Sequence, residues 1–289
     1  MTFWRLIDSG PCEAPYNMAL DESIAAAVRS GDSPPTLRLY GWCQPSVSLG
    51  AFQKITDIDT SYCAANEVEV VRRPTGGRGL LHGKELTYSF SARNEGLFSQ
   101  GLLDAYRKIS TSFLLGLQRL GLPVKMKTRH ERGSNLVRSP LCFQSTSYGE
   151  LTINGKKLIG SAQKRWADGF LQQGSIPYTV DHAALAAVFR NKGTRGKGQE
   201  SQEAGESIPV QDFAGLKDMV HDFSPPVFKV YIKESFETLF GVSLLESLPT
   251  DQEVAQAHLL CVEKYRLPLW TAGKLRTEHF CNNGIQRPA

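Results

Sequence analysis

The sequence predicts an α+β protein on three observations. An Asn-Gly pair at 154–155 stands between two alternating apolar runs, which is the strongest short-range signal for a β-hairpin. Apolar residues recur at helical spacing over 16–28 and again over 104–120. Two further strand patterns, at 68–71 and 86–90, flank a loop rich in glycine and arginine.

Size and composition describe an ordinary globular chain. Its 289 residues can bury a substantial core, and 41% hydrophobic with 21% charged residues is typical of such proteins. We expect no membrane span, because no window of about twenty apolar residues occurs. We expect no secretory signal, because the first eight residues have a strand pattern and lack the apolar h-region of a signal peptide. Six scattered cysteines without a C-x-x-C pair indicate a reducing cytoplasm, and neither they nor the histidines have the spacing of a metal site.

The N-terminal half predicts strands separated by helices. Residues 4–8 form a strand pattern ended by the following Ser-Gly-Pro, and an amphipathic helix closed by Gly31 comes next. Residues 36–42 and 47–50 are interpreted as two paired strands. The longest helix is predicted over 104–120, with glycine directly after it.

The Asn-Gly turn at 154–155 also predicts a strand register. It places Thr152 opposite Lys157 and Leu151 opposite Leu158. The apolar side chains then share one face suited to the core. Lys157 falls on the more polar face, where a cleft could lie.

The sequence predicts a main domain over 1–220 and a helical extension over 221–289 that packs on it. Asp181 begins a short helix, and residues 191–207 hold no large apolar side chain and are expected to form a flexible surface loop. In the extension, Pro225 starts a helix that Gly241 ends, and Thr250 with Glu253 forms a capping box for another.

Positive charge is concentrated in residues 125–165. Nine lysines and arginines stand there against two glutamates. The basic residues are Lys125, Lys127, Arg129, Arg132, Arg138, Lys156, Lys157, Lys164 and Arg165. Such a surface attracts anionic partners, either an acidic carrier protein or nucleic acid. Nucleic acid ranks second, because no helix-turn-helix, zinc finger or stacking motif accompanies the charge.

The loop over 71–82 is the strongest candidate for a binding site. It holds three arginines, three glycines and one histidine. Glycine lets backbone approach a ligand closely, and arginine offers planar donors to an anionic or carbonyl partner. The spacing does not fit a nucleotide P-loop, because five residues separate Gly77 from Gly83-Lys84 and Glu85 follows. A tight turn with solvated arginines is the alternative.

The loop and the strand after it together form a longer motif: Arg-Arg-Pro-Thr-Gly-Gly-Arg-Gly at 72–79, then His82, then Glu-Leu-Thr-Tyr-Ser at 85–89. This motif resembles the signature of the lipoate–protein ligase and octanoyltransferase superfamily. The LipM-type octanoyltransferases are the most similar members. The likeness covers roughly residues 3 to 180 and includes 17–22, 160–165 and 171–176. It implies the α+β catalytic domain of biotin and lipoate ligases, with mixed and antiparallel sheets and flanking helices. Trp42 and Phe52 are expected in the core, and either could line an acyl tunnel.

The resemblance also implies catalytic residues. It puts the nucleophile at Cys142, within Leu-Cys-Phe, and its activating partner at Lys157. No cysteine occurs in 169–175, where other octanoyltransferases carry theirs, and this favours the LipM type. Tyr148-Gly149-Glu150 departs from the usual aromatic-Tyr-Glu run. The implied substrate-binding residues are Arg72, Arg73, Gly76, Gly77, His82, Ser161 and Gln163.

Thiol chemistry agrees with this pairing. A free thiol of pKa about 8.5 is only about 3% thiolate at pH 7, and a nearby ammonium favours the thiolate. The alternative is that Cys142 is merely a small buried hydrophobe.

The resemblance therefore implies a cytoplasmic octanoyltransferase that uses no cofactor and no metal. It would take octanoyl from acyl carrier protein and deliver it to a lysine of a lipoyl domain, as in glycine cleavage H protein or a 2-oxoacid dehydrogenase E2. An ATP-dependent lipoate ligase, an amidotransferase between lipoyl proteins and a basic nucleic-acid-binding protein remain alternatives.

Overall fold

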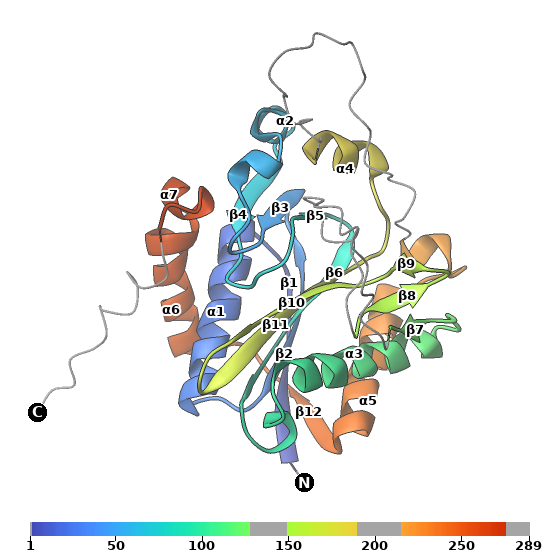
Figure 1. The fold of residues 1–289 in the computed structure, drawn as a ribbon. Helices are drawn as coiled ribbons and strands as arrows, with labels where there is room; N and C mark the ends of the chain where they lie inside the picture. The colour runs from blue at the N-terminus through green and yellow to red at the C-terminus, as the bar shows by residue number, and fades with distance from the viewer. Residues whose placement is uncertain (1, 128–148, 190–214, 276–289) are drawn as a thin grey trace, which may run out of the picture.

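The computed structural model describes residues 2–127, 149–189 and 215–275 of the chain (Figure 1). Over these residues it contains one six-stranded sheet and two three-stranded sheets. The elements in chain order are β1 Thr2–Cys12, α1 Ala14–Ser30, β2 Thr36–Trp42, β3 Ser46–Leu49, η1 Ile55–Asp57, α2 Thr60–Ala65, β4 Glu69–Arg72, β5 Leu80–His82, β6 Glu85–Arg93, η2 Gly96–Phe98, α3 Leu102–Arg119, β7 Lys125–Met126, β8 Leu151–Ile153, β9 Lys156–Lys157, β10 Gly160–Arg165, β11 Gly169–Pro177, α4 His182–Val188, η5 Leu216–Asp218, α5 Pro225–Phe240, β12 Val242–Glu246, α6 Asp251–Leu260, η6 Cys261–Tyr265 and α7 Pro268–Thr271. The predicted α+β class with mixed sheets is confirmed.

The six-stranded main sheet has the order β10-β11-β6-β2-β1-β12. β1 runs parallel to β2 and β12, whereas β2, β6, β11 and β10 pair antiparallel. Successive side chains point to opposite faces of a sheet. In β2, Leu37 and Leu39 therefore enter one hydrophobic cluster, and Tyr40 enters another. Both faces of the sheet need a covering layer.

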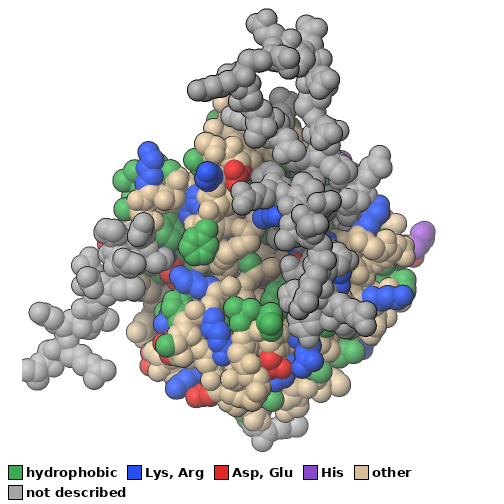
Figure 2. Space-filling model, in the orientation of Figure 1, with side chains coloured by type: hydrophobic (Ala, Val, Ile, Leu, Met, Phe, Trp, Pro, Cys, Tyr) green, Lys and Arg blue, Asp and Glu red, His purple; other side chains and the backbone are tan. Residues whose placement is uncertain are grey.

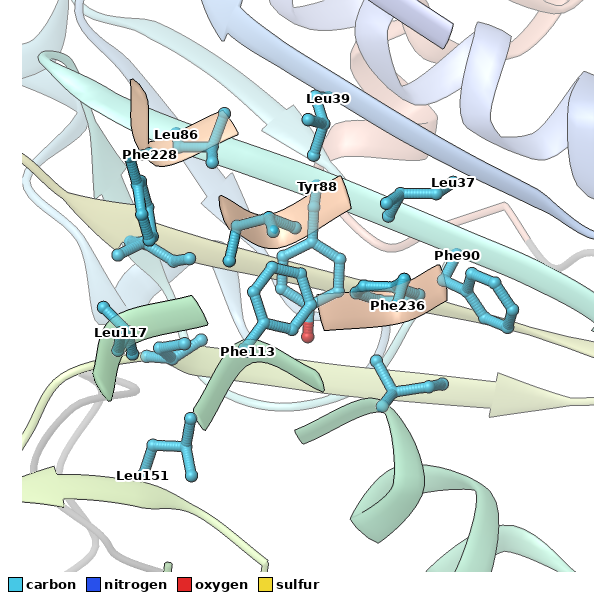
Figure 3. Packing of buried hydrophobic residues seen from close by; sticks show 14 of the residues in the cluster. Leu37, Leu39, Leu86, Tyr88, Phe90, Phe113, Leu117, Leu151, Phe228 and Phe236 are labelled. Atoms are coloured by element: carbon cyan, nitrogen blue, oxygen red, sulfur yellow. The ribbon is translucent and has the colours of Figure 1, made fainter. Parts of the chain in front are cut away.

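Helices supply that layer on each face (Figure 1). α3 and α5 cover one face and pack on each other, and α1 and α6 cover the other. Figure 3 shows the ring of Tyr88 beside that of Phe113 under α3, with ring centroids 4.1 Å apart. Burying one such aromatic side chain stabilises the fold by about 1.5–3 kcal/mol. This aromatic cluster makes the main sheet a rigid platform.

The expected pairing of 36–42 with 47–50 is wrong. β2 lies in the main sheet, whereas β3 pairs with β4 and β5 in a separate small sheet. The physical reason is that β1 and β6 already occupy both edges of β2, so no edge is left for β3. The first strand also runs further than expected, to Cys12, through an irregularity between Asp8 and Gly10.

The local signals in the sequence are confirmed. Helices α1, α3, α4 and α5 lie where their patterns predict, with Gly31 and Gly241 left-handed at two of their ends. The capping box of Thr250 and Glu253 is formed. In the hairpin, Thr152 stands opposite Lys157, and the backbone N–H of Leu158 donates to Leu151. The predicted loop 191–207 lies outside the described residues.

The C-terminal segment is more closely joined to the main sheet than a helical tail would be. β12 adds an edge strand parallel to β1, which the sequence pattern did not predict. Arg5 of β1 forms a buried ion pair with Glu253 of α6. The division of the chain at residue 220 stays a prediction. Within the described part of the chain, no helix is long and apolar enough to cross a membrane.

Candidate active site

A small cavity of about 20 Å³ lies where the sheet of β3, β4 and β5 meets the ends of β2, β6, β10 and β11. We call it the loop cavity. Its lining consists of Met18, Tyr40, Trp42, Ser48, Arg73, Leu80, His82, Thr87, Gly160, Ser161, Ala162, Gln173 and Gly174. The surface it exposes is almost entirely apolar, which suits an aliphatic chain. Three predicted binding residues, Arg73, His82 and Ser161, therefore meet here.

The side chain of Arg73 holds the glycine-arginine loop against this cavity. Arg73 donates to the carbonyls of Ser48, Gly76 and Arg78. Gly50 and Gly77 touch so closely that a Cβ on Gly50 would lie 1.9 Å from the Gly77 oxygen. Only glycine permits such a backbone approach. Gly76 and Gly77 thus shape the loop rather than line the cavity.

Arg72 occupies a different place from the one expected. Its guanidinium donates to the carbonyls of Gly50 and Gln53 and to those of Trp270 and Thr271 in α7. Burial lowers the pKa of Arg72, and the charge of Asp57 partly opposes that shift. Arg72 is not among the residues that line the loop cavity. In this structure it ties the C-terminal segment to the loop.

His82 is the centre of a buried hydrogen-bond relay. Its Nε2 lies 2.7 Å from the hydroxyl of Ser48, and its Nδ1 lies 2.8 Å from Glu85 Oε1. The imidazole stacks on Trp42 with ring centroids 3.9 Å apart. Arg73 also donates to the Ser48 hydroxyl, so both ring nitrogens of His82 and the hydroxyl between them have hydrogen-bond partners.

Glu85 stays ionised in this relay. Burial raises the pKa of its carboxyl, but the His82 charge and the hydrogen bonds from His82, Thr87 and Ser175 outweigh burial and lower it. The ionised carboxylate orients the ring of His82, which forms one wall of the cavity. Trp42 lines the same cavity and donates to Glu85, whereas Phe52 is 94% exposed and does not belong to the core.

A second hollow, too narrow to hold a water molecule, lies beside the hairpin. We call it the hairpin cavity, and it is lined by Tyr88, Tyr106, Ser110, Phe113, Glu150, Leu151, Ile159 and Ser161. Lys157 forms an ion pair with Glu150 at its edge. The side chain of Lys157 is only 2% exposed, so the face predicted to be polar is in fact buried. Its charge is compensated by Glu150 rather than by water.

Ser161 and Gln163 of β10 lie next to this cavity. Among the described residues, Ser161 alone lines both cavities. Its hydroxyl is 2.8 Å from that of Tyr88. Gln163 instead donates to Gln172 of β11 and does not line either cavity.

Cys142 falls outside the described residues, so the structure does not place the predicted nucleophile. Cys12, Cys43, Cys63 and Cys261 are free thiols. Burial raises the pKa of Cys12 and that of Cys63, so their thiolate forms are disfavoured. No group of three or more potential metal-ligating side chains occurs among the residues that the structure describes.

The sequence interpretation did not assign Asp21 and Gln173 to the site. Gln173 lines the loop cavity and accepts from Thr75, and its amide donates to Asp21 at 2.7 Å. Asp21 is fully buried and pairs with Arg38. Two adjacent glutamines in an otherwise apolar strand pattern were the available signal, because a buried amide needs partners.

A larger hollow lies on the other side of β5, between α2 and α4. It is bordered by charged and polar side chains, including Lys84, Asp181 and His182. Of the predicted site residues in the described chain it contains His82 alone. The loop cavity, which gathers three of them in an apolar setting, is therefore the stronger candidate.

Comparison with known proteins agrees with this geometry. The family model for the lipoyl protein ligase A/B catalytic domain matches residues 13–237. The octanoyltransferase LipM of Halalkalibacterium halodurans is 36% identical over 281 residues, which cover 95% of this chain and 100% of the relative. That of Kyrpidia tusciae is 38% identical over 280 residues, again 95% of this chain and 100% of the relative.

Solved structures show the same fold. A lipoate–protein ligase A bound with ATP has a TM-score of 0.77 at 22% identity, over 95% of this chain and 100% of that one. A lipoate protein ligase from Thermoplasma acidophilum with bound lipoic acid has a TM-score of 0.76 at 22% identity, over 94% and 100%. The chain belongs to the lipoyl protein ligase A/B catalytic domain family, as an acyltransferase of the LipM octanoyltransferase type.

Proposed function

We propose that this octanoyltransferase takes octanoyl from acyl carrier protein onto Cys142 and delivers it to the ε-amine of a lysine on a lipoyl domain. The observation that carries this proposal is the buried pair of Lys157 and Glu150 at the hairpin cavity, which shares Ser161 with the loop cavity. A lysine ammonium held in a dry setting next to an apolar acyl pocket fits the activation of a thiolate. Because both proposed substrates are intracellular carrier proteins, we expect the reaction to occur in the cytoplasm.

The proposed reaction needs no added energy source such as ATP. The Cys142 thiolate attacks the carbonyl of the donor thioester, and the carrier thiolate leaves and takes a proton from the Lys157 ammonium. The acceptor amine then attacks the enzyme thioester, loses its proton and releases the thiolate of Cys142. The first step exchanges one thioester for another, and the second converts a thioester into a more stable amide. Lys157 favours the thiolate in the first step and relays the amine proton in the second.

The polarity of the loop cavity supports octanoyl as the group that is bound. The loop cavity offers an apolar surface, with Met18, Trp42 and Leu80 in its lining. His82 and Arg73 are held in place by their own hydrogen bonds, so neither is left as a loose charge in the cavity. An octanoyl chain would have to widen this small cavity, but it would cover no unpaired polar group of the lining there.

The basic residues of 125–165 support an acidic carrier as donor. Lys125 of β7 is exposed, and Lys127 follows it. Figure 2 shows lysine and arginine side chains along the edge of the molecule where β7, β8 and β9 lie in Figure 1. Charge of this sign attracts an acidic partner and raises the rate of encounter.

The test is to incubate the protein with octanoyl-carrier protein, without acceptor, ATP or Mg²⁺, and to measure its intact mass. One octanoyl adduct that hydroxylamine removes is expected, and peptide mapping should locate it on Cys142. Cys142→Ala should lose both the adduct and turnover, whereas the exposed Cys43→Ser is the matched control and should keep both. An adduct on another cysteine, or full activity in Cys142→Ala, contradicts the assignment.

The same assay separates the alternatives. A strict requirement for ATP would instead indicate a lipoate ligase. If an octanoylated lipoyl protein reacts faster than octanoyl-carrier protein, the donor in this proposal is wrong and the enzyme is an amidotransferase. Salt-sensitive binding to random DNA without acyl transfer would indicate a nucleic-acid-binding protein.

A further inference from the structure

Three residues stand in line across three neighbouring strands of the main sheet. Tyr88 of β6 is the register partner of Gly174 in β11, and Gly174 is the partner of Ser161 in β10. Gly174 has no side chain, so Tyr88 reaches across it and places its hydroxyl 2.8 Å from that of Ser161. A Cβ on Gly174 would lie 2.3 Å from the Tyr88 ring and 2.7 Å from the Ser161 oxygen. The contact therefore depends on glycine in the middle strand.

The next rung of the same face extends this contact into a relay. Gln172 and Gln163 are register partners two residues along from Gly174 and Ser161. Gln163 Nε2 donates to Gln172 Oε1 at 3.1 Å, and Gln172 Nε2 donates to the Tyr88 hydroxyl at 3.0 Å. The hydrogen bonds thus point in one direction, from Gln163 toward Tyr88.

The Tyr88 oxygen accepts from Gln172, and either hydroxyl can be the donor in the contact of Tyr88 with Ser161. In the arrangement in which Tyr88 donates, the Ser161 oxygen accepts and the Ser161 proton is available to a group in the cavity. Hydrogen bonds in such a chain polarise one another, so the last hydroxyl becomes a stronger donor.

Tyr88 is suited to this position because it stays protonated. Its ring is 1% exposed and packs on Phe113. Burial raises the pKa of the Tyr88 phenol to about 12, although the hydrogen bonds with Ser161 and Gln172 act in the opposite sense. At neutral pH the phenol therefore remains a donor.

Ser161 lies where an acyl carbonyl would be transferred. It lines the loop cavity, where the aliphatic chain is proposed to bind, and also the hairpin cavity beside Glu150 and its partner Lys157. The carbonyl of a bound octanoyl group joins the apolar chain to the reacting thiol. If the reacting thiol approaches the acyl group from the hairpin side, the carbonyl oxygen lies beside Ser161.

We propose that the Ser161 hydroxyl donates to the carbonyl oxygen of the octanoyl group as negative charge develops on it. Tyr88 and Gln172 are positioning residues that act through Ser161. The inference rests on the proposed function and adds to it the group that stabilises the oxyanion. Donors aimed at that charge in a dry site are among the largest contributions to acyl transfer.

Kinetics test the catalytic part. Ser161→Ala should lower kcat for acylation on the order of 100-fold, because it removes a donor to the oxyanion. Tyr88→Phe keeps the ring and should lower kcat about two- to tenfold, the effect of one neutral hydrogen bond. KM for octanoyl-carrier protein should change little in either. Ser161→Thr retains a hydroxyl and should recover most of the loss. Tyr231→Phe on α5, a residue that lines neither cavity, is the matched control and should behave as the unchanged protein.

Infrared spectroscopy gives a readout that a purely structural role would not move. With octanoyl labelled by ¹³C at the carbonyl, the thioester stretch of the isolated acyl-enzyme should lie at lower frequency in the unchanged protein than in Ser161→Ala. Tyr88→Phe should lie between them. The effect of Tyr88→Phe should vanish in the Ser161→Ala background, because the relay acts only through that hydroxyl.

Equal carbonyl frequencies in the unchanged protein and Ser161→Ala overturn the inference. So do additive rate effects of the two substitutions, or a loss confined to KM. Failure of the proposed function itself is recognised separately, since the unchanged protein would then form no thioester on Cys142. In that event the inference falls with it.

Discussion

The ammonium of Lys157 and the carboxylate of Glu150 form an ion pair in which the two side chains are 2% and 5% exposed. They come from the two arms of one hairpin, so the Asn-Gly turn that fixes its register also brings this pair together. Burying one charge without its partner is far more costly than burying the two as a pair. The pair therefore has a structural effect that must be separated from its proposed chemistry.

Removing Lys157 alone is expected to lower both stability and activity. Lys157→Met leaves the Glu150 carboxylate buried without its partner and should cost about 3–5 kcal/mol in the free energy of unfolding. The double variant Lys157→Met/Glu150→Gln should recover most of that loss, because no unpaired charge remains. Acylation by octanoyl-carrier protein should stay slow in both, measured beside urea unfolding. Recovery of activity together with stability would show that Lys157 acts on the fold alone.

The anchor between the glycine-arginine loop and β11 should be measurable as a coupling energy. Thr75→Val removes the hydrogen bond to Gln173 from one side, and Gln173→Leu removes it from the other. Each should cost about 1–3 kcal/mol, because a buried polar group is left without its partner. Chemical unfolding of the two single variants and the double variant completes the cycle.

A coupling of about 0.5–3 kcal/mol is expected for residues in direct contact. Strict additivity would mean that the loop is held by other contacts. Gln173→Leu should also raise KM for the octanoyl donor, since Gln173 lines the cavity.

The ion pair of Arg5 with Glu253 should make stability depend on pH. Burial raises the pKa of Glu253, but the hydrogen bonds from Arg5, Thr250 and Ser33 with the charge of Arg5 outweigh it, so the pKa is lowered. A carboxyl whose pKa is lower in the folded state stabilises the protein above its unfolded value of about 4.3. That contribution is lost as pH falls through the folded value.

Unfolding by urea at pH 7 and at stepwise lower pH measures this effect. Glu253→Gln should lower the free energy of unfolding at pH 7 by up to about 3–5 kcal/mol and reduce its decline below pH about 4.3. Asp32→Asn, at an exposed position, is the control and should leave both nearly unchanged. An unaltered acid slope in Glu253→Gln would assign the pH dependence to other carboxyls.

Charge reversal on β7 should slow the capture of an acidic donor. Lys125→Glu with Lys127→Glu removes attraction from the edge nearest the hairpin, so kcat/KM for octanoyl-carrier protein should fall most at low salt and least at high salt. The single variant Lys125→Glu is compared with Lys233→Glu on α5, which changes the net charge by the same amount. A small thioester donor without a carrier should react equally well with both proteins. Equal losses of kcat/KM in the β7 variant and in the Lys233 control would show that this surface does not dock the carrier protein.

Local features were predictable from the sequence because they depend on neighbours in the chain. The hairpin register follows from the backbone conformation that Asn154 and Gly155 adopt, with both φ values positive. The helix ends at Gly31 and Gly241 and the capping box at Thr250 follow from the same kind of rule. The motif over 72–89 identified the family, and it contains His82 and Arg73, which do line the cavity.

Contacts between distant parts of the chain were decided only by the tertiary structure. β3 does not pair with β2, because β1 and β6 occupy both edges of β2. Arg72 binds carbonyls of α7, nearly two hundred residues away, instead of facing the cavity. Lys157 is buried, although its own hairpin pattern placed it on a polar face, because Glu150 pairs with it there. Tyr88 meets Ser161 only because Gly174 stands between them in a neighbouring strand. Alternation within one strand specifies which side chains share a face, but the identity of the strand beside it depends on the whole sheet.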